Sequence, residues 1–361
     1  MKALRIVLVL LLLAVAGGAA YLWFAIEKPF GGIPAEGVFV DVPHGASQRA
    51  VSRLLKEKGV IRSAIAFEVY ARRHPRRSLQ AGEYFFDRPI SGKDVYWKIA
   101  NGEIYEQPFT VKEGDTMFDI GRNLESANFM KADAFLNAAR DTTLIQDIAP
   151  NAKNLEGFLF PATYNLAKRT SATDLTAAMV HKFREALQQI APDRLDPATP
   201  GTPLLSVITL ASLVESETPK PDERPMVAGV YTNRLRKGML LQCDPTVIYA
   251  LKQVDKYKPP LLLKDLAYNS PYNTYVHSGL PPGPIGNPGE SAIRAALAPA
   301  ATDFLYFVAN TQGGHFFAAT LAEHNQNVAK YHRLLNGESA DPPVPEARQS
   351  HTAGSAPKRK R

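Results

Sequence analysis

Two glutamates close an apolar run in the middle of the chain, and their chemistry depends on what surrounds them. The run Leu204–Val214 is apolar on almost every side, which predicts a buried helix, and Glu215 and Glu217 follow at its C-terminal end. Residues two apart on a helix point about 200° apart, so one carboxylate should face a cleft and the other solvent or a structural partner. A carboxyl group held against apolar surface keeps its proton near neutral pH, as a general acid must. These residues alone also fit an ordinary solvated helix end.

Polar side chains gather in the segments that follow. Asn233 and Arg234 fall on an expected helix from about 224 to 237, and the stretch 279–289 is a rigid loop rich in Pro and Gly. Loops of this kind over a scaffold commonly line binding sites, although they also serve as plain connections. Amide and phenol groups suit a neutral sugar polymer, and aromatic rings suit the faces of its pyranoses. The expected substrate contacts are Glu156, Asn233, Gln242, Asp244, Tyr272, Asn273 and Asn287.

Other chemistries fit the sequence less well. The single cysteine, Cys243, excludes an internal disulfide and a cysteine-based zinc cluster, and His315 and His324 lack the i, i+4 spacing of a helical ligand pair. Ser212 sits within an expected helix and lacks the context of a nucleophile elbow. We therefore expect no metal and no cofactor. The net charge is +7, with four basic residues at the very end, and no basic face with interleaved aromatics is visible, so we expect no nucleic-acid partner.

The N-terminus sets the expected compartment. From Ile6 to Ile26 the chain carries no charge, and about 20 such residues span a hydrocarbon core of about 30 Å. Lys2 and Arg5 precede this run, which predicts a cytoplasmic start and a body on the far side of the membrane. A cleaved signal peptide would have a shorter apolar region and would export the same body. A buried helix of a cytosolic protein fits poorly, because the run shows no cap and no polar face.

The remaining chain reads as an α+β protein. Two small α/β units repeat one plan of strand, glycine turn and helix, with Gly45 and Gly114 in equivalent places, and the composition changes from Glu156 onward. The expected domains are an anchor at 1–28, a membrane-proximal unit at 29–106, a second small unit at 107–150, a mixed α+β catalytic domain at 151–336, and a disordered basic tail at 337–361.

Several segments together carry a family resemblance. Leu210–Thr218 with its Val-Glu-Ser-Glu-Thr, Tyr231–Leu235, Gln242–Tyr249 and Tyr272–Tyr275 closely resemble the YceG-like endolytic murein transglycosylases. The match continues in order through Gly279–Gly289, Tyr306–Ala309 and Gly313–Phe316. It covers the chain from the anchor to about Leu335 and is densest over Leu204–Asn325.

The resemblance implies a function and a catalytic residue. It implies a lyase that cuts MurNAc-GlcNAc bonds of peptidoglycan strands to give 1,6-anhydro ends, with Glu217 as the catalytic acid and base, and a role in ending strand elongation. It also implies a LysM-like module at 107–150, a single-pass anchor in the inner (plasma) membrane with the catalytic domain on the periplasmic side, and cell-wall synthases or division proteins as partners. Cys243 departs from the family, which usually has Thr there, and the basic tail has no family counterpart. Two alternatives stay open: a non-catalytic glycan-binding anchor, and a hydrolase that uses two carboxylates such as Glu217 and Asp244.

Overall fold

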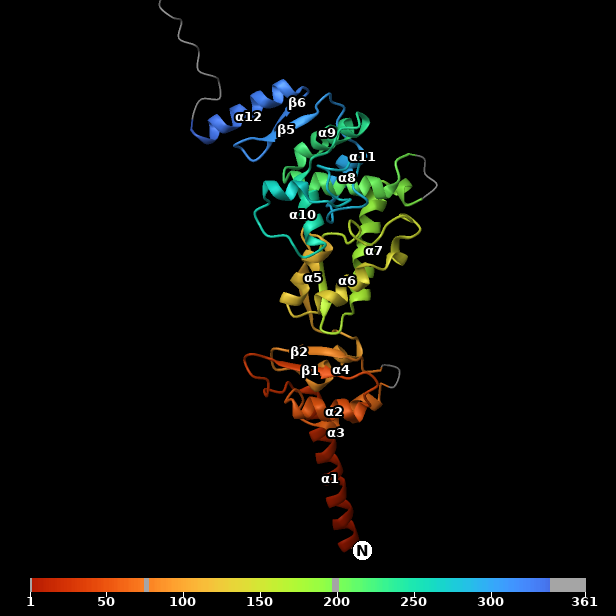
Figure 1. Cartoon of the computed structure of the whole chain (residues 1–361). Coiled ribbons are helices and arrows are strands. Elements are labelled where there is room, and N and C mark those ends of the chain that lie inside the picture. The colour runs from red at the N-terminus through yellow and green to blue at the C-terminus, as the bar shows by residue number, and fades with distance from the viewer. Residues whose placement is uncertain (1, 75–77, 197–200, 338–361) are drawn as a thin grey trace, which may run out of the picture. The chain divides into compact units, whose positions relative to one another are not determined.

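The computed structural model describes residues 2–74, 78–196 and 201–337, so the expected basic tail lies, from residue 338 on, outside the described residues. Helices predominate and the strands form small antiparallel pairs, which confirms the expected α+β class (Figure 1). The described residues fall into two compact units. The N-terminal unit comprises Met1–Lys112, Phe118–Asp141 and Pro161–His181, and the C-terminal unit comprises Glu113–Met117, Thr142–Phe160 and Lys182–Arg361.

A long apolar helix opens the N-terminal unit. Helix α1 runs from Lys2 to Glu27, and its stretch Leu4–Glu27 is long and apolar enough to cross a membrane. Most of its large apolar side chains are exposed, whereas Ala25 and Ile26 near its end are buried. Such a helix is compatible with the expected single-pass anchor, because exposed apolar surface of this length suits lipid rather than water.

The core of the N-terminal unit forms beneath one two-stranded sheet. Strand β1 (Val38–Val42) pairs antiparallel with β2 (Gly82–Phe86), and alternate residues of each strand are buried. Ser47 caps the next helix by accepting a hydrogen bond from the N–H of Ala50 at 3.2 Å, as the sequence predicts. The helices that complete this core are α2 (Gln48–Glu57), α3 (Ala64–Arg72) and α4 (Gly92–Ala100).

A second strand pair joins distant parts of the same unit. Strand β3 (Glu106–Thr110) pairs antiparallel with β4 (Thr163–Ala167), so it meets residues beyond the expected boundary at 150. Between them come α5 (Met117–Ser126), α6 (Ala132–Ala139) and a 3-10 helix at Thr142–Ile145. Helix α7 (Ala172–Ile190) and a 3-10 helix at Pro192–Leu195 follow.

The C-terminal unit is built around a buried helix. Helix α8 (Leu204–Glu217) has nine buried residues between Leu204 and Val214, which confirms the predicted buried helix. Three helices contact it: α9 (Arg224–Arg236), α10 (Asp244–Lys252) and α11 (Glu290–Leu297). The hairpin of β5 (Tyr306–Ala309) and β6 (His315–Ala318) packs against α12 (Leu321–Leu335). Short 3-10 helices lie at Pro221–Glu223 and Leu263–Ala267.

Candidate active site

The end of α8 sets the position of both glutamates. Pro219 restricts the residue before it to an extended conformation, and Thr218 accordingly has φ −138° and ψ 129°, so the helix stops at Glu217. Because Glu215 and Glu217 still belong to the helix, their side chains leave it in different directions. The expected separation of the two carboxylates is confirmed by their different partners.

Glu215 is held inside the protein by a cation and a backbone amide. Its carboxylate forms an ion pair with Arg224 and accepts a hydrogen bond from the N–H of Gly289 at 2.9 Å. The side chains of Glu215 and Arg224 are only 6% and 4% exposed. Burial raises the pKa of Glu215, and the Gly289 amide and Arg224 partly offset this rise. Glu215 therefore has the structural partner that the sequence left open.

Glu217 meets neutral hydrogen-bond donors instead of a cation. Its Oε2 accepts a hydrogen bond from the phenol of Tyr231 at 3.1 Å and lies 3.5 Å from the thiol of Cys243, which also donates. Burial raises the pKa of Glu217, while the two donors and the charge of His315 lower it and Asp244 adds to the rise. The result is a carboxyl group that holds its proton to higher pH than an ordinary glutamate does.

Glu217 opens onto a cleft of about 330 Å³. The wall combines charged, amide and aromatic side chains, and the hydroxyl of Tyr275 donates to the exposed Asp244. Gln242 has a left-handed backbone, with φ 52°, a conformation that costs free energy for any residue but glycine and is often found at functional sites. The residues that line the cleft with Glu217 are Arg234, Leu241, Gln242, Asp244, Tyr275, Phe307 and His324.

Two expected sugar contacts, Gln242 and Asp244, line this cleft, but two asparagines have other partners. Asn233 donates to the carbonyl oxygens of Thr302 and Phe304 and so fixes the chain just before β5. Asn273 is 0% exposed. Its amide donates to the Leu266 and Tyr268 carbonyls, and its Oδ1 accepts from the N–H of Tyr275. Both amides therefore position segments of the site, and Asn273 has no surface from which to contact a sugar.

Asn287 and Glu156 form a second internal network. Asn287 accepts from the N–H groups of Gly157 and Leu159 at 2.8 and 3.0 Å, and donates to the Asp115 carbonyl and to Glu156. Glu156 also accepts from the N–H of Met117. The exposed fractions of Asn287 and Glu156 are 0% and 1%, so both join loops rather than face the cleft. Tyr272 is partly buried, and its ring packs 4.9 Å from that of Tyr249.

The structure also gives roles to two residues that were not among the expected substrate contacts. Tyr231 and Arg234 both reach the region of Glu217, one as its donor and the other as part of the cleft wall. They are three residues apart on α9 and therefore share a helix face. A polar pair at this spacing, directly after the helix that carries the glutamates, is the signal that could have identified them.

Comparison with known proteins places this arrangement in a family. Residues 40–330 match the model of the YceG-like family. The chain belongs to the YceG-like family. It is 34% identical over 333 residues to the endolytic murein transglycosylase of Bacillus subtilis (strain 168), covering 88% of this chain and 91% of that one. It is 28% identical over 357 residues to the protein of that name from Streptococcus pneumoniae serotype 2 (strain D39 / NCTC 7466), covering 90% of this chain and 64% of that one.

A solved structure supports the same membership. The crystal structure of a putative yceG-like protein from Listeria monocytogenes superposes with a TM-score of 0.54 at 32% identity, covering 81% of this chain and 99% of that one. The family resemblance expected from the motifs is thus confirmed. The YceG-like match includes α8, the cleft residues and the β5–β6 hairpin, all of which lie within residues 40–330.

Proposed function

We propose that this chain is an endolytic peptidoglycan lytic transglycosylase, a lyase that cuts MurNAc-GlcNAc bonds of nascent strands, and that Glu217 is its catalytic residue. Relatives that bear the name endolytic murein transglycosylase support the activity. The observation that carries the residue assignment is the setting of Glu217: a glutamate whose pKa is raised by burial, at the end of a buried helix, facing a cleft of polar and aromatic side chains.

In this mechanism one carboxyl group performs both proton transfers. Glu217 gives its proton to the oxygen that links MurNAc to GlcNAc, and the bond from that oxygen to the muramyl C1 breaks. The muramyl C6 hydroxyl then attacks C1, and its proton returns to Glu217, which leaves a 1,6-anhydro end. No water is consumed, in contrast to hydrolysis by two carboxylates. The donors Tyr231 and Cys243 stabilise Glu217 while it is a carboxylate.

The remaining assignments follow from the same proposal. The apolar helix α1, which begins with Lys2 and contains Arg5, supports a single-pass anchor with the catalytic unit on the periplasmic side of the inner membrane. We also propose a LysM-like glycan-binding role for residues 107–150. The order of strand β3, the turn at Gly114 and helix α5 supports this role. Cell-wall synthases and division proteins are partners proposed from the family context alone.

Product chemistry tests the activity. Purified, uncrosslinked glycan strands incubated with the detergent-solubilised full chain should yield fragments ending in 1,6-anhydroMurNAc, identified by mass spectrometry. Fragments with reducing ends would instead indicate a hydrolase that uses a second carboxylate such as Asp244, which acts on the pKa of Glu217 through its charge. Binding of strands without any cleavage would indicate a glycan-binding anchor.

A further inference from the structure

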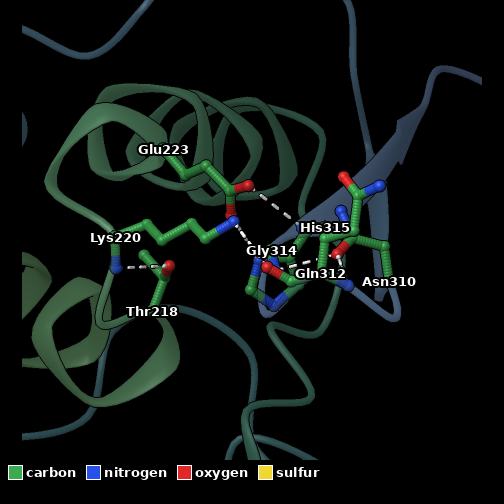
Figure 2. Close-up of polar contacts among 7 residues, drawn as sticks. All are labelled: Thr218, Lys220, Glu223, Asn310, Gln312, Gly314 and His315. Atoms are coloured by element: carbon green, nitrogen blue, oxygen red, sulfur yellow. Dashed lines mark hydrogen bonds and ion pairs between the residues drawn. The ribbon is translucent and has the colours of Figure 1, made fainter.

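His315 is hydrogen-bonded to Glu223 in the same unit as Glu217, and it has no role in the proton transfers proposed for Glu217. Glu223 stands at the end of the 3-10 helix that precedes α9, and its Oε2 lies 2.8 Å from Nδ1 of His315. Its other oxygen accepts a hydrogen bond from the backbone N–H of His315 at 3.1 Å (Figure 2). One carboxylate thus fixes both the ring and the main chain of the first residue of β6. The two side chains are only 11% and 20% exposed, for His315 and Glu223 respectively.

The hairpin turn before His315 allows Glu223 to form both of these contacts. A Cβ on Gly314 would lie 2.1 Å from Glu223 Oε1, so only a glycine lets the carboxylate come so close, and Gly313 adopts a left-handed φ of 72°. Asn310 accepts from the N–H groups of Gln312 and Gly314 at 2.8 and 2.9 Å. Lys220 adds a hydrogen bond from its ammonium to the Gln312 carbonyl at 2.8 Å (Figure 2). The imidazole is therefore presented by a turn that is fixed on several sides.

The contact with Glu223 also determines which ring nitrogen of His315 carries a hydrogen and where the ring packs. A carboxylate only accepts hydrogen bonds, so Nδ1 of His315 carries the hydrogen that is donated to Glu223. The ring packs edge-on against Phe307, with centroids 5.2 Å apart and planes at 81°. Phe307 lines the cleft together with Glu217, and its ring packs 5.9 Å from that of Tyr231. The imidazole is thus separated by one aromatic ring from the phenol that donates to Glu217.

Charge links the histidine to Glu217. The positive charge of His315 lowers the pKa of Glu217 and so favours its carboxylate form, in opposition to burial. Tyr231 of α9 and Cys243 just before α10 act in the same direction as neutral donors, whereas the charge of Asp244 of α10 disfavours the carboxylate. Arg234 of α9 lines the cleft, and Glu217 in turn acts on its pKa by charge.

We propose that the Glu223–His315 pair is a positioning device for Glu217: the imidazole, oriented by Glu223, stabilises the carboxylate that Glu217 becomes after its proton has left for the glycosidic oxygen. This inference rests on the proposed function. The pair takes no proton from the substrate and forms no bond with it. It acts only through Glu217. Glu223 orients the imidazole of His315, as the aspartate of a catalytic triad orients its histidine, and the imidazole stabilises Glu217.

The test compares variants of the pair with a variant in helix α12, which packs against the same hairpin. His315→Gln keeps an amide that can donate to Glu223 but cannot carry a charge. Glu223→Gln keeps the shape of the Glu223 side chain but removes its negative charge. Lys330→Ala is the control, because Lys330 lies over the ring of Phe316 at 4.8 Å and supports the hairpin through that neighbouring residue. Formation of anhydro ends by the full-length chain in detergent micelles is followed as kcat and KM from pH 4 to 9, per folded molecule as measured by circular dichroism.

Each variant of the pair should lower kcat about ten-fold, because the carboxylate form of Glu217 is less well stabilised, with KM changed less than about two-fold. The double variant should lose no more than either single variant, because the two residues act as one unit. In His315→Gln the alkaline limit of activity should also move to higher pH, since removing the positive charge of His315 raises the pKa of Glu217 further. Lys330→Ala should change none of these quantities.

Two results would overturn the inference while the wild-type chain still makes anhydro ends: unchanged kcat and pH limit in His315→Gln and Glu223→Gln, or a raised KM with unchanged kcat, which would make His315 a glycan contact. If His315→Gln does not fold, Glu223→Gln alone decides between these results. A wild-type chain that makes no anhydro ends would overturn the proposed function itself, and this inference with it.

Discussion

Glu215 and Glu217 are two residues apart on one helix end, and they differ in what satisfies their charge. Glu215 has Arg224 and a backbone amide, so its carboxylate form is compensated inside the protein. Glu217 accepts hydrogen bonds from a phenol and a thiol, and the charge of His315 also favours its carboxylate form. Burial outweighs these contributions and raises the pKa of Glu217. Burial raises the pKa of both carboxyl groups, but Glu215 is paired with Arg224, whereas Glu217 lines the cleft and can deliver its proton to a substrate there.

The raised pKa of Glu217 predicts that its replacement stabilises the protein. Between the ordinary glutamate value of 4.5 and its raised value, the folded protein holds a proton that the unfolded chain has lost, so stability falls as pH rises through this window. Glu217→Gln cannot ionise and should therefore melt higher than wild type above the window. The gain in the free energy of unfolding should be about 1 kcal/mol for each pH unit that separates the two pKa values. Thermal melts at pH 4 and pH 8 measure this difference.

The control for this experiment is Ser216→Ala, which changes an exposed neighbour on the same helix turn. The advantage of Glu217→Gln over wild type should shrink toward pH 4, whereas Ser216→Ala should show no such dependence. A Glu217→Gln variant that is less stable than wild type at pH 8 would mean that the carboxylate form of Glu217 is well compensated, and such a group would make a poor general acid.

At the scale of elements, the site is held together by loops rather than by a sheet. The loop 279–289, expected to bind sugar, is buried from Gly283 to Gly289, and its Asn287 joins it to the segments around Asp115 and Glu156. Backbone groups in buried loops must find partners, and an asparagine supplies two donors and two acceptor sites in one side chain. Asn287 is therefore an internal connector of three separate segments.

This role predicts a loss of stability, rather than of chemistry, when Asn287 is removed. Asn287→Ala leaves the buried N–H groups of Gly157 and Leu159 without their acceptor, and each such orphaned group costs about 1–3 kcal/mol. For the two groups together we expect a destabilisation of about 2–6 kcal/mol in chemical unfolding. Asn269→Ala, at an exposed asparagine that precedes the Tyr272–Tyr275 segment, is the matched control. Normal stability combined with lost turnover would restore Asn287 as a sugar contact.

Local sequence patterns predicted the helices well, but they did not predict the strand pairings between distant residues. The buried character of α8, the apolar helix α1 and the Ser47 cap follow from composition and spacing within a few residues. The pairing of Thr110 with Thr163 joins positions 53 residues apart, which no local period encodes. Likewise, an amide such as that of Asn273 looks the same in sequence whether it faces a sugar or two backbone carbonyls.

At the scale of the whole molecule, α1 gives the chain a part that differs in kind from the rest. Its apolar side chains are largely exposed up to Phe24, whereas Ala25 and Ile26 belong to the packed part of the N-terminal unit. The apolar run can therefore be removed without removing the two residues that pack. This division allows the anchor to be tested while the folded units are kept.

Deleting residues 2–22 should release the chain from the membrane. Wild type should fractionate with membranes, and a reporter fused after Leu335 should be active only outside the cytoplasm, since the basic start of the chain is expected to stay inside. The shortened chain should be soluble and should cleave purified strands as wild type does. Leu11→Arg should weaken insertion as well, because a charge at the centre of a spanning helix costs about 2.5–3.5 kcal/mol. A reporter active only inside the cytoplasm would exclude peptidoglycan as the substrate.

Whether Glu217 is the catalytic residue is tested most directly by the rate at which the Glu217→Gln variant releases anhydro ends from purified strands, compared with wild type and Ser216→Ala. Gln keeps the shape of Glu217 and a hydrogen-bond donor but has no transferable proton. General acid–base catalysis contributes about 10²–10⁴-fold, and one group here performs both transfers, so the loss should reach or exceed the upper end of that range. Strand binding and folding should remain, and Ser216→Ala should cleave as wild type does. Near-normal release of anhydro ends by folded Glu217→Gln would exclude Glu217 as the catalytic residue and leave Asp244, the other carboxylate of the cleft, as the candidate.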